Sequence, residues 1–153
     1  MSSAPIWSTD HPTLRNTDTV GVALRRMLAD RVTDLPVLDS AGRLVGMFKL
    51  DRVFAALLPK AALIGFGMED LAFASDTLGQ LRGRMREIES EAVQAFVVRP
   101  AHVVHPDTTP LELVLLLHQG ANNVPVVERE TGQLLGMVSA RDLLTALLTG
   151  DGE

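Results

Sequence analysis

The chain has 153 residues, 46% of them hydrophobic, and a formal net charge of −5. A chain of this length can bury one core or two small halves of one core, but not two large independent domains. The acidic balance gives no general attraction for nucleic acid or anionic lipid, because both bind clustered cations. Cysteine is absent, which excludes disulfides, thiol nucleophiles and thiolate metal sites.

Residues 1–5 lack the basic and apolar stretches of a secretory signal. No apolar run approaches the roughly 20 residues that span a bilayer. Aromatic residues make up 4% of the chain and tyrosine is absent, so stacking platforms for nucleic-acid bases are poorly supplied. We therefore expect a cytoplasmic protein that binds neither nucleic acid nor a membrane.

The first half of the chain predicts strands and helices in alternation. A leading strand, a helix, two strands joined by a turn and a closing helix are expected at residues 11–15, 20–29, 35–38, 44–48 and 50–58. Pro59 is expected to end the last helix, because proline cannot continue the hydrogen-bond ladder. The apolar residues expected on one face of the first helix are Val20, Ala23, Leu24, Met27 and Leu28.

A connector follows over residues 60–92. After a helix-start signal at Asp76, apolar residues recur at helical spacing, with charged residues between them. This predicts an amphipathic helix that packs on the rest of the protein, through Leu78, Leu81, Met85 and Ile88. Residues 94–98 are predicted to form a short strand.

The second half predicts the same order of elements. They are expected at residues 102–104, 110–118, 124–128, 134–138 and 140–148, with a turn at 129–132. The first helix has a sharp start, since Thr109 can cap it, Pro110 suits its first position and Glu112 can close a capping box.

The two halves share their sequence as well as their order of elements. Leu35-Pro36-Val37-Leu38-Asp39 matches Val124-Pro125-Val126-Val127-Glu128. After one extra residue in the second copy, Gly42–Met47 matches Gly132–Met137. Such self-similarity indicates one supersecondary unit used twice. We therefore predict an α/β (α+β) fold of two pseudo-symmetric β-α-β-β-α repeats, packed through their sheets, with a functional groove between them.

The ordered set of motifs, above all Gly136-Met137-Val138-Ser139-Ala140-Arg141-Asp142, resembles the cystathionine-β-synthase (CBS) domain. The whole chain looks like a tandem CBS pair, or Bateman module, with repeats at 9–58 and 98–148 and a connector with a strand at 59–97. The resemblance implies a regulatory module that binds AMP, ADP, ATP or S-adenosylmethionine between the repeats. We expect that no cofactor is required and that the output goes to a separate, unknown protein.

The resemblance also implies which residues hold the ligand. In the family, the carboxylate equivalent to Asp142 accepts hydrogen bonds from both ribose hydroxyls, and the residue equivalent to Ser139 lies near the phosphate. The loop 120–124 flanks the base or the phosphates, and the segment 100–102 covers the adenine. The implied binding residues are Ala101, His102, Ala121, Asn122, Asn123, Val124, Met137, Ser139, Arg141 and Asp142.

Two alternatives stay open for these motifs. Ser139 and Asp142 also have the spacing of a capping box, and one pair of residues can serve both purposes. In the first copy, Lys49 and Arg52 stand at the equivalent positions, and arginine has no acceptor for a ribose. Asp51 lies about 100° further round the helix and is expected to point elsewhere. The first-copy cleft is then either empty, or it supplies Lys49 and Arg52 to a phosphate; Arg129 and Arg141 are further candidates.

Other functions find less support. His102 and His105 are three residues apart on an expected strand and would face opposite ways, so no metal site is predicted. No phosphate loop or nucleophile elbow is present, so we expect no enzyme. The alternative to a sensor is a ligand-free structural or dimerisation module. A homodimer is expected through the helices that carry Leu113–Leu117, Leu143, Leu144, Leu147 and Leu148.

Overall fold

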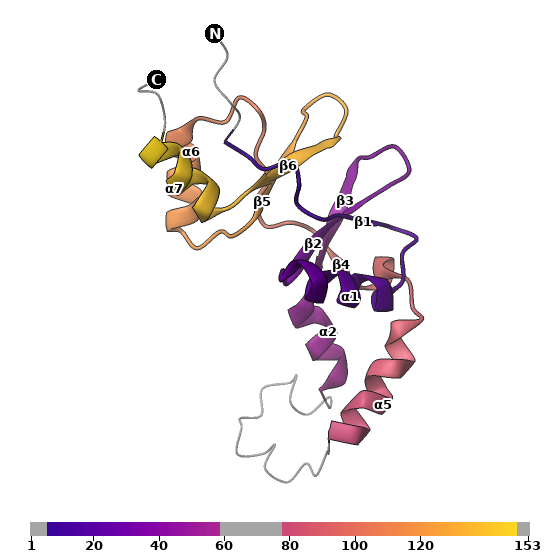
Figure 1. Ribbon diagram of the computed structural model, residues 1–153. Helices are drawn as coiled ribbons and strands as arrows, with labels where there is room; N and C mark the ends of the chain where they lie inside the picture. The colour runs from indigo at the N-terminus through magenta and orange to yellow at the C-terminus, as the bar shows by residue number, and fades with distance from the viewer. Residues whose placement is uncertain (1–5, 59–77, 150–153) are drawn as a thin grey trace.

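The computed structural model describes residues 6–58 and 78–149, which form two similar units joined by a helical segment (Figure 1). The first unit comprises β1 (Leu14–Arg15), α1 (Val20–Asp30), β2 (Asp34–Leu38), β3 (Leu44–Lys49) and α2 (Leu50–Leu57). The second comprises α6 (Pro110–His118), β5 (Val124–Val127), β6 (Leu134–Val138) and α7 (Ala140–Thr149). Between them lie α5 (Leu78–Glu89), the 3-10 helix η1 (Val93–Phe96) and β4 (Val97–Val98).

The predicted two-repeat α/β fold is confirmed. The first sheet has the order β1-β2-β3-β4, and the second contains β5 and β6. In each repeat the two central strands form an antiparallel hairpin, with Pro36 opposite Met47 and Pro125 opposite Met137. Within residues 6–58 and 78–149, no helix is long and apolar enough to cross a bilayer.

Helix starts follow the sequence closely. The Thr19 side chain caps α1 by accepting from the Val22 N–H, and Thr109 caps α6 by accepting from the Glu112 N–H. Pro110 occupies the first turn of α6, as predicted. Helix α5 confirms the connector helix from Leu78 onward, and Met85 and Ile88 pack on the first core as predicted. Leu78 does not, because its side chain is 64% exposed. The predicted start signal Asp76 and stop signal Pro59 lie outside the described residues.

Three short strands depart from the predictions. The leading strand of the first repeat is confined to Leu14–Arg15, and its counterpart in the second repeat is a single bridge between Val104 and Val126. The segment predicted as a strand at 94–98 is helical up to Phe96. This turn directs Val93 into the core and sets Phe96 edge-on to Phe48, with ring centroids 6.3 Å apart. Tertiary packing, which local propensity does not report, decides these segments.

Leu28 is a further departure, because its side chain is 82% exposed although it was predicted to face the core. Helix α1 instead buries Val20, Gly21, Ala23 and Met27. Gly21 lies on the same side of α1 as Leu28 but two turns earlier, where Glu89 of α5 covers it. This cover does not reach Leu28. Leu28 therefore faces outward in the single chain.

In each repeat, the second strand of the central hairpin pairs with a segment that precedes the other repeat in the chain. Strand β4, which precedes the second repeat, pairs with β3 of the first through Met47–Val98 and Phe48–Val97. In return, Ser8 pairs with Met137 of β6, with N–H to oxygen distances of 2.8 and 2.9 Å. The two exchanges occupy equivalent places, because Met47 and Met137 are equivalent in the repeat. They interlock the two units.

The exchange explains why both copies have glycine before this methionine. A Cβ at Gly46 would lie 2.7 Å from the Val98 carbonyl oxygen and would also meet the Val97 side chain. A Cβ at Gly136 would overlap the Ser8 carbonyl oxygen and the Trp7 ring. Only glycine lets the crossing segment approach this closely.

The tips of the two hairpins also meet. The Leu44 N–H donates to the Gly132 oxygen at 3.0 Å, and the Leu134 N–H donates to the Gly42 oxygen at 3.2 Å. Gly42 and Gly132 have positive φ angles of 82° and 76°, which favour glycine. These two hydrogen bonds join equivalent residues, so they are related by the pseudo-two-fold symmetry of the repeats.

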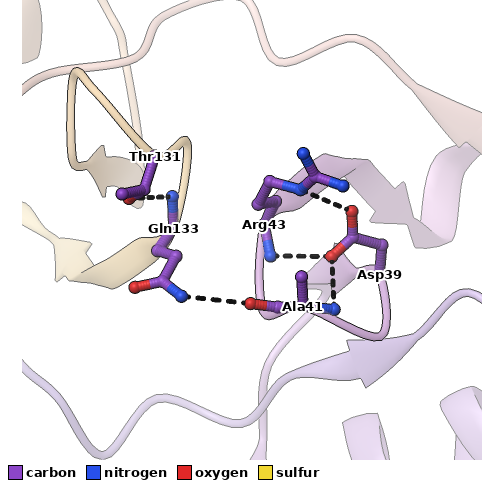
Figure 2. Close-up of polar contacts among 5 residues, drawn as sticks. All are labelled: Asp39, Ala41, Arg43, Thr131 and Gln133. Atoms are coloured by element: carbon purple, nitrogen blue, oxygen red, sulfur yellow. Dashed lines mark hydrogen bonds and ion pairs between the residues drawn. The ribbon is translucent and has the colours of Figure 1, made fainter.

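Side chains reinforce the tip contact (Figure 2). The Gln133 side chain donates to the Ala41 oxygen at 3.1 Å across the two repeats. Asp39 closes its own turn by accepting from the N–H groups of Arg43 and Ala41, both at 2.9 Å. The Arg43 backbone N–H above all holds the pKa of Asp39 below its ordinary value.

A third link between the repeats joins Asp34 to Asn123, which occupy equivalent positions in the two copies. The Asn123 Nδ2 donates to the Asp34 Oδ1 at 3.2 Å. Burial raises the pKa of Asp34, while His11, Asn123 and Lys49 lower it by smaller amounts. The net direction is upward from 3.8, so this carboxylate is charged at some cost to stability.

We expect Gly46→Ala and Gly136→Ala each to lower the free energy of unfolding by about 1–3 kcal/mol, because the added methyl group displaces the crossing backbone. Urea denaturation of the three variants measures the effect. Gly83→Ala in α5 is the matched control, since a Cβ added at Gly83 would have nothing within 4 Å. It should be neutral or stabilise by up to about 1 kcal/mol. Equal effects at all three positions would contradict the proposed role of close approach.

We expect the effect of Asp34→Asn on the stability of the folded protein to be more favourable at pH 7 than at pH 3.5. Because folding raises the pKa of Asp34, the wild-type chain loses stability as pH rises from 3.8 through the folded-state value. Asparagine has no such titration, and its oxygen still accepts from Asn123. Melting temperatures of both proteins across this range measure the difference. A difference independent of pH would contradict the raised pKa.

Candidate ligand-binding site

A cavity of about 540 Å³ lies between the two repeats. One wall comes from the first repeat, through residues 33–34 and the junction of β3 with α2. The other comes from the second repeat, through residues 100–102 and the loop 119–125. This volume is in the usual range of small-molecule sites, so the groove predicted between the copies exists.

The β3–α2 junction presents charged groups to the cavity. Lys49 ends β3 and stands at the N-terminal cap position of α2, but its side chain makes no capping hydrogen bond. Asp51 lies in the first turn of α2, and Phe54 follows one turn later on the same side. The junction therefore supplies an ammonium, a carboxylate and an aromatic ring.

The loop after α6 is shaped by two left-handed residues, Gly120 with φ 99° and Asn123 with φ 48°. The Gly120 N–H donates to the Leu117 oxygen at 3.2 Å, and the Ala121 N–H donates to the Leu116 oxygen at 3.1 Å. These bonds fold the loop back over the helix end. Asn123 adopts the left-handed conformation, which asparagine tolerates better than most residues.

The lining is chemically mixed. Asp34 and Asp51 offer carboxylates, and Lys49 offers an ammonium. Burial raises the pKa of Asp34, which also accepts the Asn123 hydrogen bond. The apolar part of the lining comes from Met47, Leu50, Phe54, Pro100, Ala101, Ala121, Val124 and Pro125. Such a cavity can cover a flat apolar group and hydrogen-bond hydroxyl or amino groups at its rim.

The predicted binding residues fall into two groups. Those that line the cavity are Ala101, His102, Ala121, Asn122, Asn123 and Val124. Those absent from this lining are Met137, Ser139, Arg141 and Asp142. The second group lies at the β6–α7 junction. This junction does not line the cavity, because the loop after α6 faces the β3–α2 junction of the other repeat.

The position of Asp51 corrects a prediction. It was expected to point away from the first-copy cleft, yet it lines the cavity, whereas Arg52 is exposed and is not among the lining residues. The first turn of α2 approaches the cavity with Leu50 and Asp51, and Arg52 lies about 100° beyond. Thr33 and Asp34 also line the cavity and were not among the predicted binding residues, although Asp34 is the repeat equivalent of the predicted Asn123.

Ser139 and Asp142 form the predicted capping box. The Asp142 N–H donates to Ser139 Oγ at 3.2 Å. In return, Asp142 Oδ2 accepts from the Ser139 N–H at 2.9 Å and from its hydroxyl at 3.0 Å. Of the other predicted phosphate contacts, Arg129 lies 3.0 Å from the Asp107 carboxylate and lowers the pKa of Asp107.

The two neighbouring histidines occupy different places. His102 lines the cavity between the repeats. His105 lies with Nδ1 2.8 Å from the Val127 oxygen, at a second cavity within the second repeat. Over the described stretches 6–58 and 78–149, no group of three or more His, Asp or Glu side chains is placed to hold a metal ion.

Similar proteins share this architecture. A CBS domain-containing protein of unknown function from Kribbella flavida has a TM-score of 0.71 and 19% identity, over 94% of this chain and 96% of that one. A CBS domain pair/ACT domain protein from Thermotoga maritima has a TM-score of 0.62 and 22% identity, over 95% and 97%. CBSX2, solved in complex with AMP, has a TM-score of 0.64 and 21% identity, over 94% and 92%. No curated protein matches the chain.

Likeness at these identities shows the fold. The sequence pattern of the CBS domain matches the chain twice, over residues 5–59 and 91–149. Both matches coincide with the repeats that flank the cavity, and together they cover more than half of the chain. The protein therefore belongs to the CBS domain family and carries a tandem CBS pair.

Proposed function

We propose that this CBS pair is a regulatory sensor that binds an adenosyl ligand, AMP, ADP, ATP or S-adenosylmethionine, in the cavity between its repeats. The observation that carries the proposal is the cavity itself, with apolar residues contributed by both repeats and carboxylates contributed by the first. The AMP complex of CBSX2, a protein with the same fold, supports the choice of ligand class. CBS pairs are regulatory modules and are generally non-catalytic.

Each part of such a ligand has a matching group in the lining. Ala101, Ala121 and Val124 provide small apolar surfaces for the base, with His102 beside them. Asp51 provides an acceptor-only carboxylate that can take two ribose hydroxyls at once. Lys49 and the start of α2 favour a negatively charged group, because the first N–H groups of a helix carry partial positive charge. Met137, Ser139, Arg141 and Asp142 lie at the β6–α7 junction outside this lining and take no part in the proposed site.

A ligand in this cavity would contact both repeats. The Asp34–Asn123 hydrogen bond joins two lining residues across the repeats. A ligand that contacts both walls stabilises one relative arrangement of the repeats over others. We propose that a separate partner protein in the cytoplasm reads this arrangement, and that neither nucleic acid nor a membrane takes part.

We also propose that the module forms a homodimer through α6 and α7. These helices expose an apolar face, with Leu147 at 64%, Leu148 at 75% and Leu111 at 78% exposure. Leu115 and Leu144 add to it at 54% and 57%. Soluble monomers rarely expose contiguous apolar surface of this kind, and covering it against a second copy is favourable.

One observation favours an alternative function. Asp142 Oδ2 and the Ser139 hydroxyl bond to each other in the cap of α7. If Lys49 and Asp51 likewise hold no ligand, the chain is a structural or dimerisation module. The ligand experiment below separates this alternative from the sensor.

We expect at least one of AMP, ADP, ATP and S-adenosylmethionine to raise the melting temperature, because a ligand that binds only the folded state stabilises it. Asp51→Ala should weaken the apparent affinity about tenfold or more, through loss of a charge-assisted contact. Ala101→Trp should abolish the shift by filling the cavity. Thermal shift with calorimetry measures both.

Asp142→Ala is the matched control for this experiment. It should lower the stability of the free protein by about 0.5–2 kcal/mol through loss of its cap, while leaving the ligand-induced shift unchanged. The reverse pattern, with Asp142 required and Asp51 dispensable, would place the ligand at the β6–α7 junction. No stabilisation by any of the ligands at millimolar concentration would favour the structural module.

Leu147→Glu should convert the dimer to a monomer, because a buried, unpaired carboxylate is costly at an interface. Light scattering coupled to size exclusion measures the mass of each protein. Leu78→Glu is the control, since Leu78 is a similarly exposed leucine, at 64%, on α5, remote from α6 and α7 (Figure 1). A wild-type monomer at micromolar concentration would refute the homodimer.

A further inference from the structure

The charged groups that line the cavity between the repeats are more negative than positive. Asp34 and Asp51 contribute carboxylates, and Lys49 contributes an ammonium group. Arg52 and Arg99 are next to lining residues in the sequence, but both are exposed and neither belongs to the lining. Within residues 6–58 and 78–149, two carboxylates therefore face the cavity against one permanent cation.

The central hairpin of the first repeat places Asp34 beside Lys49. The two residues stand directly opposite each other on β2 and β3, and opposite residues of an antiparallel pair project from the same face of the sheet. Burial raises the pKa of Asp34, and the smaller effects that lower it include the charge of Lys49. The positive charge of Lys49 is thus partly balanced inside the protein, which leaves less of it to attract an anionic ligand.

The surroundings of Asp34 make its charge count in the cavity. Its side chain is half-buried, and its partner across the repeats is the neutral amide of Asn123, which donates to Oδ1 at 3.2 Å. A charge in such a place is screened less than a charge in open water. A positive group of a ligand in the cavity is therefore stabilised by Asp34, whereas a phosphate chain is repelled.

The candidate ligands of the sensor share adenosine and differ in charge. AMP, ADP and ATP carry increasing negative charge, because each phosphate adds to it. S-Adenosylmethionine carries a sulfonium and an ammonium group against a single carboxylate, so its net charge is positive. Of the four, it is the one whose charges complement two carboxylates and one ammonium group.

We propose that the cavity selects its adenosyl ligand by charge, that S-adenosylmethionine is the preferred ligand, and that Asp34 is a specificity-determining residue. Asp34 attracts the positive part of the ligand, and Lys49 meets its single carboxylate. Asp51 keeps its place at the ribose hydroxyls. This selectivity depends on the proposed sensor function, since it concerns the same cavity.

Isothermal titration calorimetry of the full-length protein, at constant ionic strength, measures the selectivity. The ligands are S-adenosylmethionine, S-adenosylhomocysteine, AMP and ATP, the last with and without magnesium. S-Adenosylmethionine should bind about tenfold more tightly than ATP, or better, because one ligand is attracted and the other repelled. It should also bind more tightly than S-adenosylhomocysteine, which lacks the methyl group and with it the sulfonium charge.

Asp34→Asn tests the specificity residue, because it removes the charge and keeps an oxygen that can accept from Asn123. It should weaken S-adenosylmethionine binding about tenfold and strengthen ATP binding. Glu130→Gln is the matched control, since it removes the same charge from an exposed turn residue outside the lining. It should leave both affinities unchanged. Ala101→Trp should abolish binding of every ligand by filling the cavity.

The outcomes separate charge selection from the sensor function. If ATP or AMP, with or without magnesium, binds more tightly than S-adenosylmethionine, charge selection is wrong while the sensor function stands. Equal affinities for S-adenosylmethionine and S-adenosylhomocysteine, or a preference over ATP that Asp34→Asn leaves unchanged, would have the same meaning. Binding of no ligand in the set would overturn the sensor function, and charge selection with it.

Discussion

The structure depends on the reciprocal exchange of backbone pairing at Gly46 and Gly136. At each glycine, a segment that precedes one repeat pairs with the hairpin of the other, and a Cβ would collide with the crossing backbone. A two-stranded hairpin is marginal on its own in water. The exchange supplies an additional paired segment to each hairpin, so neither repeat is complete without residues that lie beyond its own boundary.

This crossing also decides which surfaces meet. It brings the loop after α6 toward the junction of β3 with α2, so the cavity combines Asn123 of one repeat with Asp34, Lys49 and Asp51 of the other. The reciprocal hairpin-tip bonds and the Asp34–Asn123 contact hold this arrangement at separate points. In a module built this way, binding of a ligand between the repeats can be coupled to their relative position, because each wall of the cavity belongs to a different repeat.

The two repeats are alike in backbone but differ in what covers them. The first core is covered by α5 and η1, which contribute Met85, Ile88, Val93 and Phe96. The second core is covered by Ile6 and Trp7 among the described residues, and it encloses a cavity beside α6. Apolar surface remains on α6 and α7 in the single chain. The symmetric scaffold thus leaves its second repeat with more surface that other molecules can cover.

The sequence by itself determined the repeat, the order of elements, the helix starts and the equivalence of Pro36 with Pro125, because periodicity, caps and turns act over a few residues. It also identified the loop residues of the cavity through family resemblance. Only the tertiary structure decided that this loop faces Lys49 and Asp51 and not Ser139 and Asp142, that Leu28 is exposed and that residues 94–96 turn. These outcomes depend on contacts between segments far apart in the chain, and the crossing at Gly46 and Gly136 sets those contacts.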